Sequence, residues 1–189
     1  LLVSLFALSG AFAQTTLKIG ASPVPHGDIL EFISPILAAE GINIQVVEFT
    51  DYVQPNLALA AGDLDANYFQ HVPYLDQFSA DHGLSLVSLG GNFVAPIGIY
   101  SSRHASFDAL PNGASIAIPN DPTNGGRALL LLASTGLIEL SANAGLQATP
   151  LDIVSNPKNI RIVELEAPQL PRALQDVDAA AINTNYALE

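Results

Sequence analysis

The residues best suited to bind a small ligand fall together in residues 119–127, which read PNDPTNGGR. This stretch lies between a short apolar segment and a strongly apolar one, so we expect it to join a strand to a helix. Glycine, asparagine and threonine at a helix N-terminus leave backbone N–H groups free for an anion, which the helix dipole favours. Arg127 adds a planar guanidinium that can hold a carboxylate through two hydrogen bonds. The alternative is an ordinary helix cap beside a solvated arginine.

Aromatic residues concentrate in the first half of the chain, where they could form one wall of a ligand pocket. Tyr52, Phe69 and Tyr74 occupy loop-like or strand-end positions, so they are the pocket candidates. Phe49 and Phe78 are more typical of the core of one lobe. The same cluster could serve entirely as core, and the sequence leaves both uses open.

The four histidines, His26, His71, His82 and His104, lack the short spacing of a metal site, and there is no cysteine. We therefore expect neither a metal ion nor a cofactor. His71 follows a predicted strand beside the aromatic candidates. It could hydrogen-bond a ligand in the pocket, or it could be a satisfied structural histidine.

Two pairs of carboxylates, Asp63 with Asp65 and Asp176 with Asp178, could suggest acid–base chemistry. Both pairs sit at predicted helix-to-strand turns, where capping of the turn is the expected role. No G-x-S-x-G nucleophile elbow is present. Nothing specifies an enzyme, so an exported α/β enzyme remains only the rival hypothesis.

Apolar periodicity predicts alternating strands and helices, which is typical of an α/β fold with largely parallel sheets. The expected strands cover residues 17–21, 42–49, 64–69, 84–89, 93–100, 115–118, 160–165 and 177–182. The expected helices cover residues 28–39, 55–61, 73–80, 127–134 and 171–175.

A weak internal repeat suggests two lobes. Residues 58–66 and 173–179 both run from an apolar helix end through an acidic turn into a strand of small residues. The first strand would deliver residues 68–71 at its carboxyl end, and the second would deliver Asn183. Ligands of open α/β sheets bind at such carboxyl ends, so the pattern favours two α/β lobes that face a cleft.

The charge balance excludes several partners. The 6 Lys and Arg against 18 Asp and Glu give a net charge of −12, with no basic cluster for nucleic acid or for an anionic membrane surface. With 49% hydrophobic and 13% charged residues, the chain can bury a core. In so acidic a chain, a cation beside a Gly-Gly turn stands out.

Residues 1–13 carry no charge and end in Ala11-Phe12-Ala13, the small-x-small pattern of a secretory cleavage site. We interpret them as a signal peptide truncated at its start, because the chain begins with Leu1 and contains no methionine. A membrane anchor or a buried strand is the alternative. A cleaved signal implies export to the periplasm.

Six stretches, taken together and in order, resemble the NlpA/MetQ family of substrate-binding proteins, from about Leu17 to the last residue. They are residues 51–56 (DYVQPN), 66–75 (ANYFQHVPYL), 119–132 (PNDPTNGGRALLLL), 156–159 (NPKN), 164–172 (ELEAPQLPR) and 181–187 (AINTNYA). The resemblance implies a two-lobed periplasmic-binding-protein clamp of the type II kind. Lobe 1 would begin with residues 14–94, lobe 2 would cover residues 95–183, and residues 184–189 would start the return to lobe 1.

The resemblance also implies a function. A monomeric member captures methionine in the cleft and hands it to the permease of an ABC importer and, through it, to the ATPase. Arg127 would pair with the ligand carboxylate, and Asn183 would hydrogen-bond the polar end of the ligand. The remaining site residues implied are Tyr52, Phe69, His71 and Tyr74 around the thioether, and Asn120 and Asn124 in the loop.

The sequence departs from the family pattern at two places. Family members are typically lipoproteins, but Ala11 stands where the lipid-bearing cysteine would be, so we expect a soluble periplasmic protein cleaved after Ala13. The family chain continues beyond the position of Glu189, so we expect the closing part of lobe 1 to be missing here. A methionine-containing dipeptide or another small amino acid is the alternative ligand.

Overall fold

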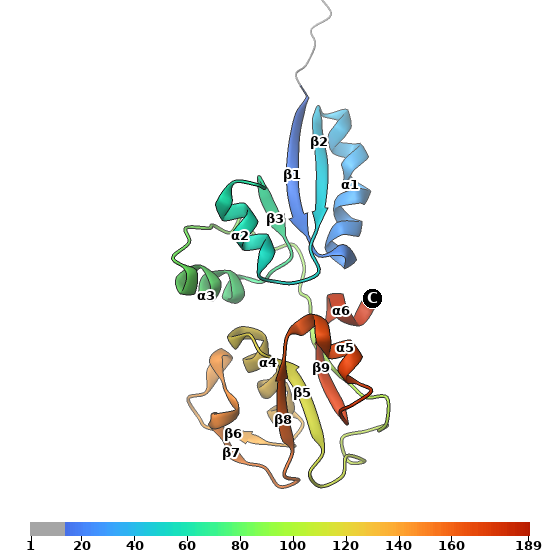
Figure 1. The fold of residues 1–189 in the computed structure, drawn as a ribbon, viewed down its shortest axis with the longest axis vertical. Helices are drawn as coiled ribbons and strands as arrows, with labels where there is room; N and C mark the ends of the chain where they lie inside the picture. The colour runs from blue at the N-terminus through green and yellow to red at the C-terminus, as the bar shows by residue number, and fades with distance from the viewer. Residues whose placement is uncertain (1–13) are drawn as a thin grey trace, which may run out of the picture.

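The computed structural model describes residues 14–189, which form two α/β lobes arranged end to end (Figure 1). The predicted signal peptide and Ala11 fall on residues 1–13 and lie outside the described residues. Within residues 14–189, no helix is long and apolar enough to cross a membrane. The α/β class and the clamp-like pair of lobes expected from the sequence are confirmed.

The first lobe is built on a parallel sheet with the strand order β2-β1-β3. Its strands are β1 (Thr15–Ala21), β2 (Ile42–Glu48) and β3 (Ala66–Tyr68). Its helices are α1 (Asp28–Ala39), α2 (Gln54–Ala61) and α3 (Val72–His82). Helices α1 and α2 are the connections between parallel strands, as the pattern of apolar residues predicts. The segment after β3 and the loop before α2 carry most of the predicted aromatic wall.

The second lobe contains a four-stranded sheet with the order β4-β9-β5-β8, in which only β4 runs antiparallel. Its strands are β4 (Ile97–Tyr100), β5 (Ser115–Pro119), β8 (Arg161–Leu165) and β9 (Ala179–Asn183). Its helices are α4 (Pro122–Ser134) and α5 (Leu170–Ala173), and a small antiparallel ladder joins β6 (Glu139–Leu140) to β7 (Ile153–Ser155).

Strands β5 and β9 are buried on both faces, which explains their nearly continuous apolar sequence. Ile116 and Ile118 of β5 pack on one face in a cluster that includes Leu129 of α4. Ala117, from the same strand, points to the other face and packs in a cluster that includes Leu170 of α5. The sheet therefore packs between α4 and α5, and the carboxyl end of β5 leads directly into α4.

The segment that precedes β4 and the segment that follows β9 lie side by side and are hydrogen-bonded to each other. The backbone N–H and the hydroxyl of Thr184 both donate to the carbonyl of Pro96, at 3.3 and 2.6 Å. The last helix, α6 (Thr184–Leu188), lies between the lobes (Figure 1). Its Tyr186 hydroxyl donates to the carbonyl of Thr50 in the first lobe, at 3.0 Å.

The expected strand at residues 84–89 and the first part of the one at residues 93–100 are wrong. Only Ile97–Tyr100 is paired, and residues 84–96 run without a ladder. Val87 and Leu89 are 79% and 92% exposed. A β-branched and apolar pattern makes a strand only where a neighbouring strand accepts its hydrogen bonds, and none of the described residues does so here.

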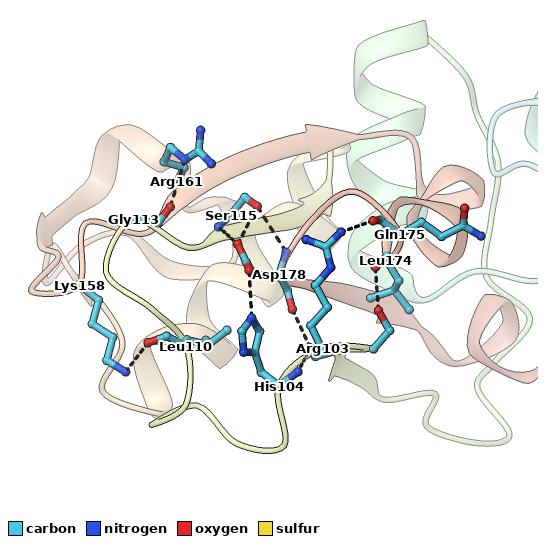
Figure 2. Close-up of polar contacts among 12 residues, drawn as sticks. Arg103, His104, Leu110, Gly113, Ser115, Lys158, Arg161, Leu174, Gln175 and Asp178 are labelled. Carbon is cyan, nitrogen blue, oxygen red and sulfur yellow. Dashed lines mark hydrogen bonds and ion pairs between the residues drawn. The ribbon is translucent and has the colours of Figure 1, made fainter.

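Side chains, rather than regular structure, hold the long connection between β4 and β5 (Figure 2). Asp178 is the centre of this network: one oxygen accepts from Ser115 N at 2.8 Å and from Ser115 Oγ at 3.1 Å, and the other lies 3.0 Å from His104 Nε2. Lys158 Nζ donates to three carbonyls of the connection, including that of Leu110. The carboxylate of Asp178 therefore joins its turn to β5 and to the β4–β5 connection, a long-range role that differs from the predicted capping of the turn itself.

We expect Asp178→Ala to lower the free energy of unfolding by about 1 to 3 kcal/mol, because two buried donors of Ser115 lose their acceptor. Urea unfolding measures the change. Asp176→Ala removes an exposed carboxylate two residues earlier and should leave stability near the wild type. Equal effects of the two substitutions would show that the Asp178 network contributes nothing beyond its charge.

Candidate ligand-binding cleft

A cavity of about 910 Å³ lies between the two lobes and is lined by residues of both. Its size suits a small organic ligand. The cavity brings together seven of the eight residues predicted from the sequence, drawn from segments more than 100 positions apart. They are Tyr52, Phe69, His71, Tyr74, Asn124, Arg127 and Asn183.

The apolar wall of the cavity comes from three rings of the first lobe. The ring centroids of Tyr52 and Phe69 lie 6.1 Å apart, and those of Tyr52 and Tyr74 lie 5.9 Å apart. The Tyr74 hydroxyl donates to the carbonyl of Tyr52 at 2.9 Å, which fixes the two segments relative to each other. Burial raises the pKa of both tyrosines, so their hydroxyls stay neutral donors. Phe78 packs behind this wall as core.

A buried amide pair joins the two segments that carry the wall. Asn56, which is completely buried near the start of α2, donates from Nδ2 to Gln70 Oε1 at 2.8 Å. Gln70 Nε2 donates back to Asn56 Oδ1 at 2.7 Å, and Asn67 Nδ2 donates to the same oxygen at 2.9 Å. Because the bonds are reciprocal, α2 and the segment after β3 are locked in one register.

The polar end of the cavity is built around Arg127. Its guanidinium donates to Asn124 Oδ1 at 3.0 Å and to the carbonyl of Ala95 at 2.8 Å. Burial lowers the pKa of Arg127, but an arginine remains charged at physiological pH. Across residues 14–189 the one ion pair within 4.0 Å joins His104 and Asp178, so this half-buried cation is balanced by neutral acceptors there. Its remaining N–H groups suit an incoming carboxylate.

Two amides that line the cavity carry buried polar atoms without a protein partner in the described part of the chain. They are Oδ1 of Asn183, an acceptor, and Nδ2 of Asn185, a donor. Asn183 Nδ2 donates to Asn124 Oδ1 at 2.9 Å, and Asn185 Oδ1 accepts from the Tyr52 hydroxyl at 2.6 Å. Each amide is therefore held at one end while its other end remains available, which suits recognition of a ligand with both a donor and an acceptor.

The start of α4 differs from the expectation of free backbone N–H groups. Asp121 is the N-cap, and its carboxylate accepts from the N–H of Asn124 at 2.9 Å, while the N–H of Gly125 donates to the carbonyl of Asp121 at 2.8 Å. The helix N-terminus thus already has its own anion. The alternative expectation, that Arg127 is a solvated arginine, is also wrong, because Arg127 lines the cavity.

Asn120 is the one predicted site residue that the structure does not bring to the others. It is exposed and lies outside the cavity lining, and its N–H donates to the carbonyl of Leu165 at 2.8 Å. It is the last residue before the Asp121 cap, so it extends the β5–β8 edge rather than the wall of the cavity.

His71 and His26 both line the cavity, and burial lowers the pKa of each. His71 stacks on Tyr74 with ring centroids 6.3 Å apart, and the positive charge of Arg127 lowers its pKa further. His26 is 6% exposed and makes an edge contact to Tyr68 at 4.8 Å. Nε2 of His71 and Nδ1 of His26 are buried without a protein partner among residues 14–189. Both rings are thus neutral donor–acceptors rather than cations.

We expect stability to fall as the pH drops from about 6.5 towards 4, because burial lowers the pKa of His26 from 6.5 to about 4. In that window the unfolded histidine binds a proton and the folded one does not, so protonation favours unfolding. The melting temperature of His26→Gln should depend less on pH across this window. Asp178 does not interfere, because its pKa is lowered from 3.8 to about 2 and its stabilisation is lost only below the window.

The assignment to His26 is contradicted if His26→Gln and the wild type show the same slope between pH 6.5 and 4.

Two residues of the cavity, Asn185 and His26, were missed as site residues at the sequence level. Asn185 follows Asn183 at a spacing of two, just past a strand end, and this Asn-Thr-Asn pattern was the available signal. His26 follows a strand in the Pro-rich turn of residues 23–27 and had no such pattern beside it.

The cavity supplies groups for binding rather than for bond cleavage. Within residues 14–189, no group of three or more His, Cys, Asp or Glu side chains is placed to hold a metal ion. The Ser115, His104 and Asp178 cluster is no catalytic triad, because both Ser115 and His104 contact the aspartate instead of each other. It also lies outside the cavity lining.

Comparisons with known proteins place the chain among methionine-binding relatives. The "D-methionine-binding lipoprotein MetQ" of Salmonella typhimurium is 58% identical over 149 residues, which cover 78% of this chain and 55% of that relative. The protein of the same name from Yersinia pestis is 56% identical over 93% of this chain and 66% of its own length. The chain therefore spans between about half and two thirds of these curated relatives.

Solved structures agree with the fold. A nutrient binding protein from Burkholderia cenocepacia bound to methionine superposes with a TM-score of 0.88, at 52% identity over 91% of this chain and 73% of that one. A periplasmic substrate-binding protein of an ABC transporter from Coxiella burnetii gives a TM-score of 0.87, at 46% identity over the same shares of the two chains. Residues 17–189 match the NlpA lipoprotein family. The resemblance carried by the sequence motifs is confirmed, and the chain belongs to the NlpA lipoprotein family.

Proposed function

We propose that the protein is an extracytoplasmic substrate-binding protein that captures methionine between its lobes. One observation carries the proposal: a single cavity holds a half-buried arginine, an aromatic wall, and an amide acceptor and an amide donor that have no partner among residues 14–189. A zwitterionic amino acid with an apolar side chain supplies a partner for each of these groups. The methionine bound to the Burkholderia relative and the name of the MetQ relatives support that choice of amino acid.

In the proposed complex the ligand carboxylate pairs with Arg127 and accepts a hydrogen bond from Asn185 Nδ2. The ligand ammonium donates to Asn183 Oδ1. The thioether lies against Tyr52, Phe69, Tyr74 and His71, where burial of apolar surface and sulfur–aromatic contacts both contribute. Only the thioether end distinguishes methionine from other amino acids. Asn124 completes the proposed set by orienting Arg127 and Asn183, whereas Asn120 lies outside the cavity lining.

We further propose how the protein works in transport. Residues 14–94 begin lobe 1, residues 95–183 form lobe 2, and residues 184–189 start the return to lobe 1. Ligand contacts from both lobes favour the closed clamp. The closed form, a monomer exported to the periplasm by the peptide of residues 1–13, delivers methionine to an ABC permease and its ATPase. The name of the Coxiella relative supports this role.

The proposal is tested by calorimetry of the full chain against L-methionine, D-methionine and a methionine-containing dipeptide. We expect one-to-one binding of methionine in the micromolar range or tighter, which corresponds to about −8 kcal/mol or better. The titration with the dipeptide tests the alternative ligand against methionine. Absence of binding to every one of them would overturn the proposal, and recovery of a chemically changed ligand would favour the rival enzyme.

A further inference from the structure

Asp121 lies behind the polar end of the cavity, outside the residues that line it. Its carboxylate accepts hydrogen bonds from the N–H of Asn124 at 2.9 Å and from the hydroxyl of Thr123 at 3.0 Å. Both of its oxygens also accept from Asn124 Nδ2, at 3.0 and 2.9 Å. A helix cap needs only the first of these bonds, so the two bonds to the Asn124 side chain are additional.

These two hydrogen bonds determine the orientation of the Asn124 amide. An ionised carboxylate can only accept hydrogen bonds, so the NH₂ group of Asn124 must face Asp121. Oδ1 of Asn124 is thereby turned towards the cavity. There it accepts from the guanidinium of Arg127 at 3.0 Å and from Asn183 Nδ2 at 2.9 Å. Arg127 can only donate, so it independently requires the same orientation.

The same reasoning extends one residue further, to Asn183. Because Asn124 presents an oxygen, the NH₂ group of Asn183 must face it. Asn183 Oδ1 is then directed away, and it is buried without a protein partner in the described part of the chain. Asn183 itself is 7% exposed. Asp121 and Arg127 thus determine together, through Asn124, that the cavity offers an acceptor at this position and not a donor.

We propose that Asp121 is a positioning residue that makes the cavity selective for ligands with a protonated α-amine. The proposal rests on the proposed function for its ligand. An ammonium group can only donate, so it matches the oxygen of Asn183 and would be opposed by an NH₂ group. Without Asp121, Arg127 alone still orients the Asn124 amide, so the oxygen of Asn183 is held in the cavity less firmly and the discrimination in favour of the amine falls.

The test compares methionine with 4-(methylthio)butanoate, which has the same carboxylate and thioether but no amine. The variant is Asp121→Ser, since serine is as good an N-cap as aspartate but offers no second oxygen to Asn124. We expect the ratio of the two affinities to fall about tenfold from its wild-type value. The ratio of methionine to norleucine affinity should not change, because the aromatic wall is untouched. A loss of affinity that came only from destabilised folding would leave the ratio of methionine to 4-(methylthio)butanoate affinity unchanged.

Asp152→Ser is the matched control. Asp152 is another capping carboxylate of the second lobe, accepting from Thr149 N at 2.8 Å and Thr149 Oγ1 at 2.9 Å, and it lies outside the cavity lining. The Asp152→Ser variant loses the same charge as Asp121→Ser and should retain the wild-type ratio of methionine affinity to 4-(methylthio)butanoate affinity. Measurement at low and high salt separates a through-space attraction between Asp121 and the amine, which salt screens, from the orientation effect, which it does not.

A second readout needs no ligand. In the wild type, the side-chain NH₂ protons of Asn124 should exchange slowly in ¹H–¹⁵N spectra, because both carboxylate oxygens hold them. Asp121→Ser, or Asp121→Asn if the serine variant does not fold, should speed their exchange. A folded variant with a wild-type ligand ratio, or with unchanged Asn124 exchange, overturns the proposal. A wild-type protein that binds no methionine contradicts the proposed function, and the exchange measurement then decides the role of Asp121 by itself.

Discussion

Replacing Arg127 with alanine is expected to weaken methionine binding by about 100-fold or more. The guanidinium is half-buried and has N–H groups left after its bonds to Asn124 and Ala95, so a carboxylate placed there would make charge-assisted bonds worth about 1.5 to 3 kcal/mol each. The variant would also leave the ligand carboxylate in the cavity without a counter-charge, which adds to the loss. Each tenfold change in affinity corresponds to about 1.4 kcal/mol. Titration calorimetry with the full chain measures the effect.

Two further variants show whether charge or geometry is lost. Arg127→Lys keeps the charge but not the planar fork, so its affinity should fall between those of the wild type and Arg127→Ala. Arg172→Ala removes an exposed cation outside the cavity lining and should leave the affinity unchanged. If Arg127→Ala binds methionine as tightly as Arg172→Ala does, the carboxylate does not pair with Arg127.

Gly126→Ala is expected to destabilise the second lobe more than any single loss of a surface contact. A Cβ at this position would overlap the carbonyl oxygen of Leu146 and lie 2.7 Å from its carbonyl carbon and 3.1 Å from the N of Ala148. These are backbone atoms of the turn Gly145–Gln147 and its neighbour, so no side-chain rotation relieves the clash. Overpacking of this kind costs about 3 kcal/mol. The melting temperature should then fall by roughly 6 to 12 °C, as calorimetry can measure.

The matched control for this prediction is Gly91→Ala. A Cβ at Gly91 would have no atom within 4 Å, so its melting temperature should stay at the wild-type value. Leu146 and Arg127 both line the cavity, so a displaced turn should also weaken ligand binding in Gly126→Ala. Equal melting temperatures for the two alanine variants would contradict the close approach of α4 and the turn.

The elements that the sequence predicted well are those whose apolar periodicity is local. Helix α1 and strand β5 were placed within a residue or two, because α1 has its own helical periodicity of apolar residues and β5 is a short apolar run that is buried throughout. Residues 84–96 show the opposite case. Their pattern suits a strand, but strand formation depends on a partner elsewhere in the chain, and sequence spacing carries no information about that partner.

The candidate site was predictable in its residue types and less so in its geometry. The sequence indicates Arg127 and the aromatic wall as site residues, and the cavity contains them. The reason offered for Gly125 and Gly126 was a backbone anion site, whereas Cβ atoms there would clash with the carbonyls of Pro119 and Leu146. The orientation of the Asn124 and Asn183 amides depends on contacts between residues 59 positions apart, which only a folded structure reveals.

The distribution of the tyrosines has an optical consequence. The chain has no tryptophan and five tyrosines, of which Tyr52, Tyr68 and Tyr74 line the cavity and Tyr186 packs 5.2 Å from Tyr52. The ultraviolet emission of the whole protein therefore originates mainly at the cleft. Quenching or enhancement of that emission can report occupancy of the cleft directly, without a label and without a competing signal from tryptophan.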